Sequence, residues 1–197
     1  MSNIYINNTY NFKITMTKIN IIVAICKNNG IGINNKLPWY YSSDLKKFKT
    51  LTTGNKKNAV IMGKNTYQSL NKKLLNRDNL ILSKSLIIDK INDNNISKSF
   101  NNLDNLLNFT KTKNYENIWI IGGNQIYELF LKKNIVDKIY LTYINKLHDC
   151  DIFFPKINLN NFKLIKNSIQ YNDNEFLKDL DLYYNNYEIY DKLYIKI

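Results

Sequence analysis

Short apolar runs alternate with helical patterns along most of the chain, and this alternation limits the fold more than any other feature. The runs at 19–26 (INIIVAIC), 58–63 (NAVIMG) and 117–121 (NIWII) are mostly apolar, as expected of strands buried on both faces. The same patterns predict strands at 79–84, 94–100 and 137–144, and helices at 42–51, 65–70, 101–110 and 124–133. Residues 181–197 alternate as antiparallel edge strands do. The sequence predicts an α/β fold, with a mostly parallel central sheet, helices on both faces and an antiparallel C-terminal edge.

The chain of 197 residues is long enough for one domain with a sizeable core. We expect a polar N-terminal extension over residues 1–18 and a single domain over 19–197. The longest apolar run, residues 19–26, is far shorter than the roughly 20 residues of a membrane span. The N-terminus has no basic region followed by an apolar one, so we expect no signal peptide, no membrane partner and a cytoplasmic location.

The formal net charge of +12 raises the question of nucleic acid binding. The lysines are scattered through the chain and form no dense basic block, which favours solvated surface lysines that steer small anions toward a cleft. Cys26 and Cys150 are far apart in the sequence and the single histidine, His148, has no neighbouring ligands. We therefore expect no disulfide framework and no metal site.

Several predicted strands end in turns rich in Gly, Ser or Thr, at 28–32, 62–66, 82–84 and 120–125. Ligands of an open α/β sheet bind outside the carboxyl ends of its strands, where helix N-termini offer free N–H groups. Two such turns suit the two phosphates of a dinucleotide, and Lys64 and Lys84 would add positive charge for a further phosphate. Ordinary strand-to-helix turns would look the same, and neither GxGxxG nor GxxxxGK[ST] is present.

Two single residues each allow two interpretations. Asp44 lies in the first turn of a predicted helix, where a carboxylate can cap the helix or, facing Trp39, Leu45 and Phe48, can bind the N–C–NH₂ edge of a heterocycle. Arg77 is the only arginine in the chain. It is either a chance survivor of a bias toward lysine or a site that needs a planar fork to grip a carboxylate or phosphate.

Six ordered blocks of the sequence together resemble the dihydrofolate reductase family. The first block combines IVA (22–24), GIG (30–32), LPW (37–39), Asp44 and Phe48, and the others are VIMGKNTYQSL, NLILSK, WIIGGNQIYELFL, IYLTYI and CDIFFP. The distance from Trp39 to Asp44 is similar to that of the bacterial form. The resemblance implies NADPH-dependent reduction of dihydrofolate to tetrahydrofolate for one-carbon metabolism and thymidylate synthesis, with hydride transfer to C6 and protonation at N5.

The resemblance also implies roles for individual residues. Asp44, Trp39 and Thr142 would be the catalytic residues, with Asp44 binding the pterin, Thr142 bonded beside it and Trp39 holding a water. The implied substrate-binding residues are Ile22, Val23, Asp44, Leu45, Phe48, Lys49, Arg77, Ile121, Tyr127 and Thr142. Among them, Arg77 would grip the α-carboxylate of the glutamate tail.

For NADPH, the resemblance implies a lid over the nicotinamide, a lysine-rich adenosine site and a pyrophosphate site with a cis Gly122–Gly123 bond. The implied cofactor-binding residues are Ala24, Ile31, Gly32, Asn35, Lys36, Leu37, Gly63, Lys64, Asn65, Thr66, Leu82, Ser83, Lys84, Gly122, Gly123, Asn124, Gln125, Ile126 and Tyr127. Departures from the family pattern are the absence of Pro and Gly from NKKLLNRDN, Tyr67 in place of a common tryptophan, and Tyr143 after Thr142.

Three alternatives stay open at this point: a related NADPH-dependent reductase of the riboflavin pathway, a basic nucleic-acid-binding module, and the reductase half of a fused reductase–thymidylate synthase. Because no synthase sequence follows Ile197, we expect a standalone enzyme. We also expect a monomer that binds antifolate inhibitors and no specific nucleic acid.

Overall fold

The computed structural model describes residues 16–70, 72–92, 95–170 and 189–197. Its strands are β1 (Lys18–Cys26), β2 (Gly30–Gly32), β3 (Asn58–Gly63), β4 (Asp78–Leu82), β5 (Asp89–Asn92), β6 (Asn95–Phe100), β7 (Asn117–Gly122), β8 (Lys138–Ile144), β9 (Ile152–Phe153), β10 (Phe162–Gln170) and β11 (Ile189–Lys196). Its helices are α1 (Ser42–Thr53), α2 (Lys64–Ser69), α3 (Leu103–Lys111) and α4 (Asn124–Lys132).

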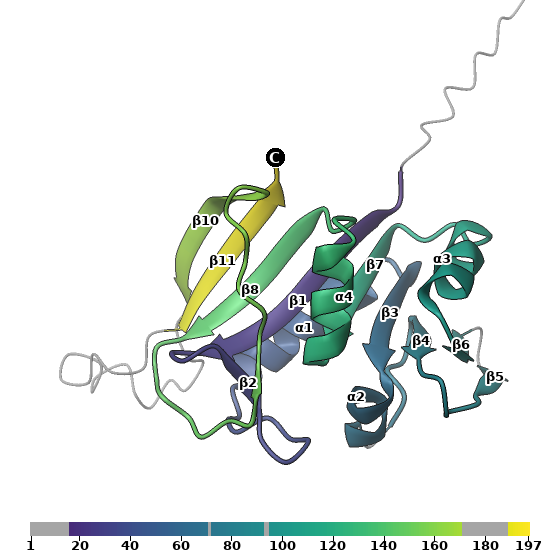
Figure 1. Ribbon diagram of the computed structural model, residues 1–197, viewed down its shortest axis with the longest axis horizontal. Helices are drawn as coiled ribbons and strands as arrows, with labels where there is room; N and C mark the ends of the chain where they lie inside the picture. The colour runs from purple at the N-terminus through teal and green to yellow at the C-terminus, as the bar shows by residue number, and fades with distance from the viewer. Residues whose placement is uncertain (1–15, 71, 93–94, 171–188) are drawn as a thin grey trace, which may run out of the picture.

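The main sheet in the described residues has nine strands in the order β10-β11-β8-β1-β7-β3-β4-β6-β5 (Figure 1). The strands from β8 to β6 pair in parallel, which confirms the predicted parallel core. β11 and β10 add the predicted antiparallel C-terminal edge. β5 adds an antiparallel strand at the other edge that the sequence patterns did not indicate. Of the predicted tail strands, residues 181–188 lie outside the described residues.

Apolar side chains leave the central strands in both directions, which is why helices cover both faces. On one face, Ile21 and Ile120 pack with Phe130 of α4. On the other face, Ile22 packs with Phe48 of α1. Figure 1 shows α4 in front of the sheet and α1 behind it. The helices therefore lie on both faces, as predicted from the mostly apolar runs.

The carboxyl ends of β1, β3, β4 and β7 lie at one edge of the sheet, where β2 and β9 form a small second sheet. A Cβ atom on Gly30 would lie 2.3 Å from Sγ of Cys150 and 2.9 Å from Sγ of Cys26, so only glycine fits at the start of β2. The two cysteines, distant in the sequence, have their Sγ atoms 3.7 Å apart, and both are free thiols. The fold thus brings together two thiols that lie 124 residues apart in the sequence.

Within the described ranges, no helix has both the length and the apolar character needed to cross a bilayer.

Candidate active site

Asp44 lies in the first turn of α1, half-buried between the helix and β8. The N-cap residue of α1 is Tyr41, and no side chain caps the helix there. Asp44 instead accepts a hydrogen bond of 2.6 Å from the hydroxyl of Thr142 on β8. Burial raises the pKa of the Asp44 carboxyl, and the Thr142 hydrogen bond and the charge of Lys47 partly offset this. This geometry favours the ligand-binding interpretation of Asp44 over the capping one.

Trp39 stands before α1 at the end of the loop that follows β2. Its indole Nε1 is buried and has no hydrogen-bond partner among the described residues. Its ring contacts His148, with centroids 5.2 Å apart. A buried N–H without a partner is unfavourable, so this donor is suited to a bound water or ligand.

The apolar residues predicted to hold the substrate divide between the two faces of the sheet. Ile22, Phe48 and Ile121 gather on the α1 face, beside Asp44. Leu45 is 39% exposed on α1, which leaves its side chain free to contact a ligand. The side chain of Val23 belongs to the core on the opposite face, so the structure does not bring it together with Ile22. Lys49 is exposed on α1.

Arg77 is only 4% exposed, just before β4. Its Nε donates to the carbonyl of Leu75 over 3.0 Å, and its Nη1 donates to the hydroxyl of Thr52 on α1. Its Cζ lies 5.9 Å from the centroid of the Phe48 ring. No carboxylate in the described part of the chain pairs with it. Burial lowers the pKa of the guanidinium, and a buried cation held only by neutral partners favours an anionic ligand.

The predicted cofactor residues lie at the carboxyl edge of the parallel strands. At the β7–α4 junction, the Gly122–Gly123 bond is cis, as the family resemblance implied, and Gly122 has a φ of 108°. Gly123 caps α4 without a side-chain hydrogen bond. A Cβ atom on Gly123 would lie 3.5 Å from Oγ1 of Thr66, so the first turns of α2 and α4 approach each other here. Free N–H groups at the start of α4 suit an anion.

Tyr127 in α4 is fixed rather than free. Its hydroxyl donates to the carbonyl of Ile22 over 3.0 Å, and burial raises the pKa of the phenol, which keeps it protonated. A Cβ atom on Gly122 would lie 2.9 Å from the Tyr127 ring. Tyr127 therefore links α4 to β1, with its ring against Gly122.

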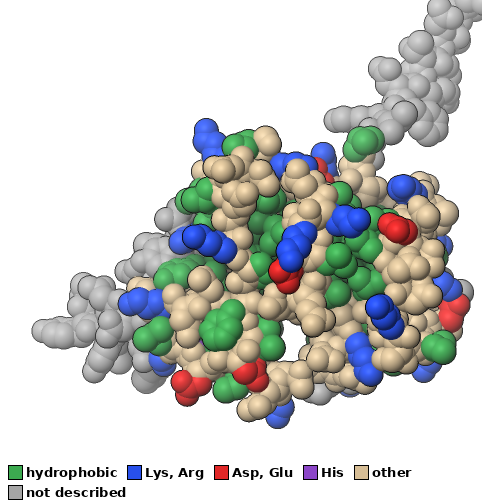
Figure 2. Space-filling model, in the orientation of Figure 1, with side chains coloured by type: hydrophobic (Ala, Val, Ile, Leu, Met, Phe, Trp, Pro, Cys, Tyr) green, Lys and Arg blue, Asp and Glu red, His purple; other side chains and the backbone are tan. Residues whose placement is uncertain are grey.

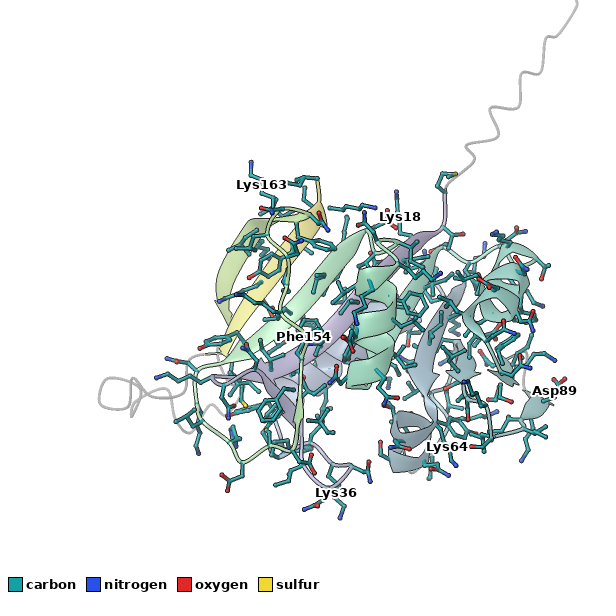
Figure 3. The ribbon with its side chains drawn as sticks, in the orientation of Figure 1. Lys18, Lys36, Lys64, Asp89, Phe154 and Lys163 are labelled. Carbon is teal, nitrogen blue, oxygen red and sulfur yellow. The ribbon has the colours of Figure 1, made fainter. Side chains whose placement is uncertain are left out.

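Lysines flank this edge on both sides. Lys64 begins α2 and donates to the hydroxyl of Ser85 over 3.1 Å. The Ser83 hydroxyl accepts from the backbone N–H groups of Ser85 and Leu86, which fixes the turn after β4 and leaves Lys84 exposed. Figure 2 shows the surface hollowed between the region of β2 and the region of α2, and Figure 3 shows Lys36 and Lys64 on these two regions. Gly63 and Leu82 are the last residues of β3 and β4, and Asn65 lies in the first turn of α2.

The loop between β2 and α1 has the left-handed turns that its asparagines allow. Asn34 and Asn35 have positive φ angles of 50° and 60°. Asp151 holds the loop, because its carboxylate accepts from the N–H of Asn34 over 2.9 Å and its own N–H donates to the carbonyl of Gly32 over 3.0 Å. The predicted lid residues Asn35, Lys36 and Leu37 are exposed, Ile31 and Gly32 lie in β2, and Ala24 faces Thr142 across the β1–β8 pair.

Sequence reasoning missed four residues at the site: Lys47, Thr52, Asp151 and Asp191. Lys47 lies one helical turn after Asp44, so helical spacing could have indicated it. Asp191 pairs with Thr142 across β8 and β11. Nothing in the sequence fixes that register, because β11 is joined to β8 through β9 and β10.

The mostly parallel sheet, the glycine-capped α4 and the half-buried carboxylate beside an apolar wall are features that suit an α/β oxidoreductase with a dinucleotide cofactor and a flat heterocyclic substrate. The family profile described as "Dihydrofolate reductase" matches residues 18–188. The chain belongs to the dihydrofolate reductase family.

Individual relatives agree with this assignment. A dihydrofolate reductase of Heliothis virescens is 36% identical over 159 residues, covering 77% of this chain and 86% of the relative. One of Gallus gallus is 35% identical, covering 75% and 82%. A bifunctional dihydrofolate reductase-thymidylate synthase of Plasmodium berghei is 39% identical over 149 residues, covering 70% of this chain and 25% of the relative.

Proposed function

We propose that this chain reduces 7,8-dihydrofolate to 5,6,7,8-tetrahydrofolate with NADPH, at the site formed by α1 and the carboxyl ends of β1 and β7. The observation that carries the proposal is the buried carboxyl of Asp44, bonded to Thr142 at 2.6 Å beside an apolar wall. The two oxygens of the Asp44 carboxylate suit the two hydrogen bonds that the N3 and 2-amino edge of a pterin donates. The product supplies one-carbon metabolism and thymidylate synthesis.

Asp44 orients the pterin and favours protonation at N5 through its negative charge. Thr142 holds the carboxyl group in place. The unpartnered Nε1 of Trp39 holds the water that delivers the proton. These three side chains come from β8, α1 and the loop before α1, so the fold itself sets their geometry.

The remaining substrate residues line the path from the pterin to the glutamate tail. Ile22, Leu45, Phe48 and Ile121 contact the pterin and aminobenzoyl rings, and Val23 contributes through its backbone because its side chain faces the other core. Lys49 and Arg77 take the tail, with the α-carboxylate on the guanidinium of Arg77.

The residues at the strand ends fit NADPH, because an uncapped helix N-terminus, a close glycine contact and exposed lysines suit phosphates. Gly122 through Tyr127 take the pyrophosphate, and Gly63 through Thr66 with Leu82, Ser83 and Lys84 take the adenosine half. The lysines favour a 2′-phosphate. Ala24, Ile31, Gly32 and the loop at 35–37 cover the nicotinamide and exclude water. When bound, NADPH supplies the hydride that C6 of dihydrofolate accepts.

We further propose a folding domain over residues 19–197 preceded by a polar extension over 1–18, a monomeric state, a cytoplasmic location, and inhibition by diaminopyrimidine antifolates, which present the same amidine-like edge to Asp44.

The test is the loss of reduced-nicotinamide absorbance when purified protein is mixed with NADPH and dihydrofolate, with and without a diaminopyrimidine antifolate. We expect turnover that the antifolate blocks. Asp44→Asn is expected to abolish most turnover while NADPH still binds, as measured by quenching of protein fluorescence. Full turnover by Asp44→Asn at neutral pH would remove Asp44 from the mechanism.

A further inference from the structure

A charged side chain on α1, that of Lys47, also reaches the Asp44–Thr142 pair. The Nζ atom of Lys47 donates to Oγ1 of Thr142 over 2.9 Å, and Thr142 in turn donates to Oδ1 of Asp44 over 2.6 Å. An ammonium group can only donate, so the Thr142 oxygen must accept from it. This leaves the Thr142 proton directed at Asp44.

Lys47 is itself held by a second carboxylate. Asp191 of β11 lies opposite Thr142 in the β8–β11 pair and forms an ion pair with Lys47. The two side chains are 20% and 25% exposed, so this ion pair has little contact with bulk water. Because α1, β8 and β11 each contribute one member, the arrangement depends on tertiary packing and not on a flexible surface contact.

The two partners act on Asp44 with opposite sign. The positive charge of Lys47 lowers the pKa of Asp44 and the negative charge of Asp191 raises it, on top of the larger upward effect of burial. Together they form a nearly neutral pair, whereas either one alone would leave a net charge beside the carboxyl group. Other titratable groups on the packed elements are Lys46 on α1, Tyr140 and Tyr143 on β8, Lys166 on β10, Lys192 on β11 and Tyr127 on α4.

We propose that Lys47 is a positioning residue, which fixes the hydroxyl of Thr142 toward Asp44 and, balanced by Asp191, sets the charge state of the Asp44 carboxyl group. This inference rests on the proposed function for its consequence in catalysis. The charge balance itself is a property of the free protein and can be measured without activity.

The first test is titration of the Asp44 carboxyl carbon by NMR in the ligand-free protein. Lys47→Met is expected to move the titration of Asp44 to higher pH, and Asp191→Asn to move it to lower pH. The double variant Lys47→Met/Asp191→Asn is expected to titrate close to the parent. Lys46→Met is the matched control, because Lys46 is the neighbouring lysine on α1 and has no hydrogen bond to Thr142. In Lys46→Met, Asp44 should titrate at the same pH as in the parent.

The variants should also differ from the parent in kcat. In Lys47→Met, kcat at neutral pH is expected to fall about tenfold, within the range seen for coupled members of one hydrogen-bond network, and Lys47→Arg should recover most of it. A cavity of about 570 Å³ lies on this flank of α1, lined by Lys47 and Asp191 among others. Added methylamine or ethylamine should therefore partly restore Lys47→Ala, while the corresponding alcohols should not.

Shifts of the same sign in Lys47→Met and Asp191→Asn would overturn the proposal, as would an unchanged Asp44 titration in Lys47→Met. An equal shift in Lys46→Met would show a general charge effect and would also overturn it. If the opposite shifts occur in a protein that does not reduce dihydrofolate, the proposed function fails and this inference stands.

Discussion

The proposed role of Arg77 in binding the substrate carboxylate can be tested by a single substitution. The guanidinium is buried, and among the described residues it donates to the Leu75 carbonyl and the Thr52 hydroxyl alone, so its remaining N–H groups are suited to a carboxylate with two parallel bonds. We expect Arg77→Lys to raise the KM for dihydrofolate about tenfold or more, since a lysine cannot form both bonds. NADPH binding should change little. The measurement is steady-state kinetics with each substrate varied in turn.

Loss of packing could also raise the KM of Arg77→Lys for dihydrofolate, because the arginine lies over Phe48. Dihydropteroate, which lacks the glutamate tail, separates the two causes. The parent and Arg77→Lys should have similar KM values for it. An equal penalty on both substrates would show that Arg77 is structural and has no role with the carboxylate.

Asp44 should make the folded protein less stable at neutral pH than a neutral residue would. Burial raises its pKa above the ordinary value of 3.8, so the folded protein holds this proton more tightly than the unfolded chain. The free energy of unfolding therefore falls as pH rises from 3.8 through the raised pKa, and levels off above it. Asp44→Asn has no carboxyl group to ionise and does not lose this stability. We therefore expect its Tm to exceed that of the parent at pH values above the raised pKa of Asp44.

Thermal melts across a pH series measure this difference. The Tm advantage of Asp44→Asn should shrink as pH falls toward 3.8, where the parent carboxyl is also neutral. Asp149→Asn, at an exposed position, serves as the control and should show no such trend. A lower Tm for Asp44→Asn at neutral pH would contradict the sign of the pKa shift.

At the residue scale, motif spacing could predict Asp44, Thr142 and the glycine pair, because these residues lie inside blocks that the family shares. Helical spacing could indicate that Lys47 lies near Asp44, but nothing in the sequence could predict Asp191 or the contact of Lys47 with Thr142. The role of Lys47 depends on which residue of β11 faces Thr142, and strand register is set by packing of the whole sheet.

Among the elements, the parallel core and the antiparallel C-terminal edge were predictable, whereas β5, β9 and β10 as individual strands were not. Strands such as β3 are buried on both faces and read as apolar runs in the sequence. β10 (FKLIKNSIQ) and β5 (DKIN) mix polar and apolar residues, since edge strands contact a neighbour on one side only. The two-residue β9 has too little sequence to show any pattern, and its pairing with β2 follows from the loop that precedes it.

The contact between β2 and the loop before β9 gives an element-scale prediction. A Cβ atom on Gly30 would lie 2.3 Å from Sγ and 2.5 Å from Cβ of Cys150, so Gly30→Ala must push the loop away. We expect it to lower the free energy of unfolding by about 1–3 kcal/mol, the usual range for overpacking. Denaturant unfolding measures the loss, and Cys150→Gly in the same chain should recover much of it.

Gly32→Ala is the matched comparison, since its nearest neighbour would be the carbonyl oxygen of Lys36 at 3.3 Å. Cys150→Gly should not rescue Gly32→Ala. Equal destabilisation of both glycine variants, with or without Cys150, would show that general loss of glycine flexibility, rather than the thiol contact, is responsible.

For the whole molecule, the net charge of +12 comes from lysines that are scattered through the sequence. Figure 2 shows lysines over the visible face with hydrophobic side chains between them, and Figure 3 places Lys18 and Lys163 at the edge of the sheet opposite Lys36 and Lys64. Scattered positive charges of this kind attract small anions at long range. NADPH, with its phosphates, should therefore be steered to the hollow by the nearby lysines.

We expect the association rate constant for NADPH to fall as salt is added, because the screening length shortens to about 10 Å at 0.1 M. The dissociation rate constant should change less. Lys36→Gln and Lys163→Gln remove the same charge from the whole molecule, but Lys36 lies beside the hollow and Lys163 at the far edge. Stopped-flow binding should show slower association for Lys36→Gln and near-parental association for Lys163→Gln. Equal slowing in both would mean that total charge, rather than its placement at the carboxyl edge, attracts the cofactor.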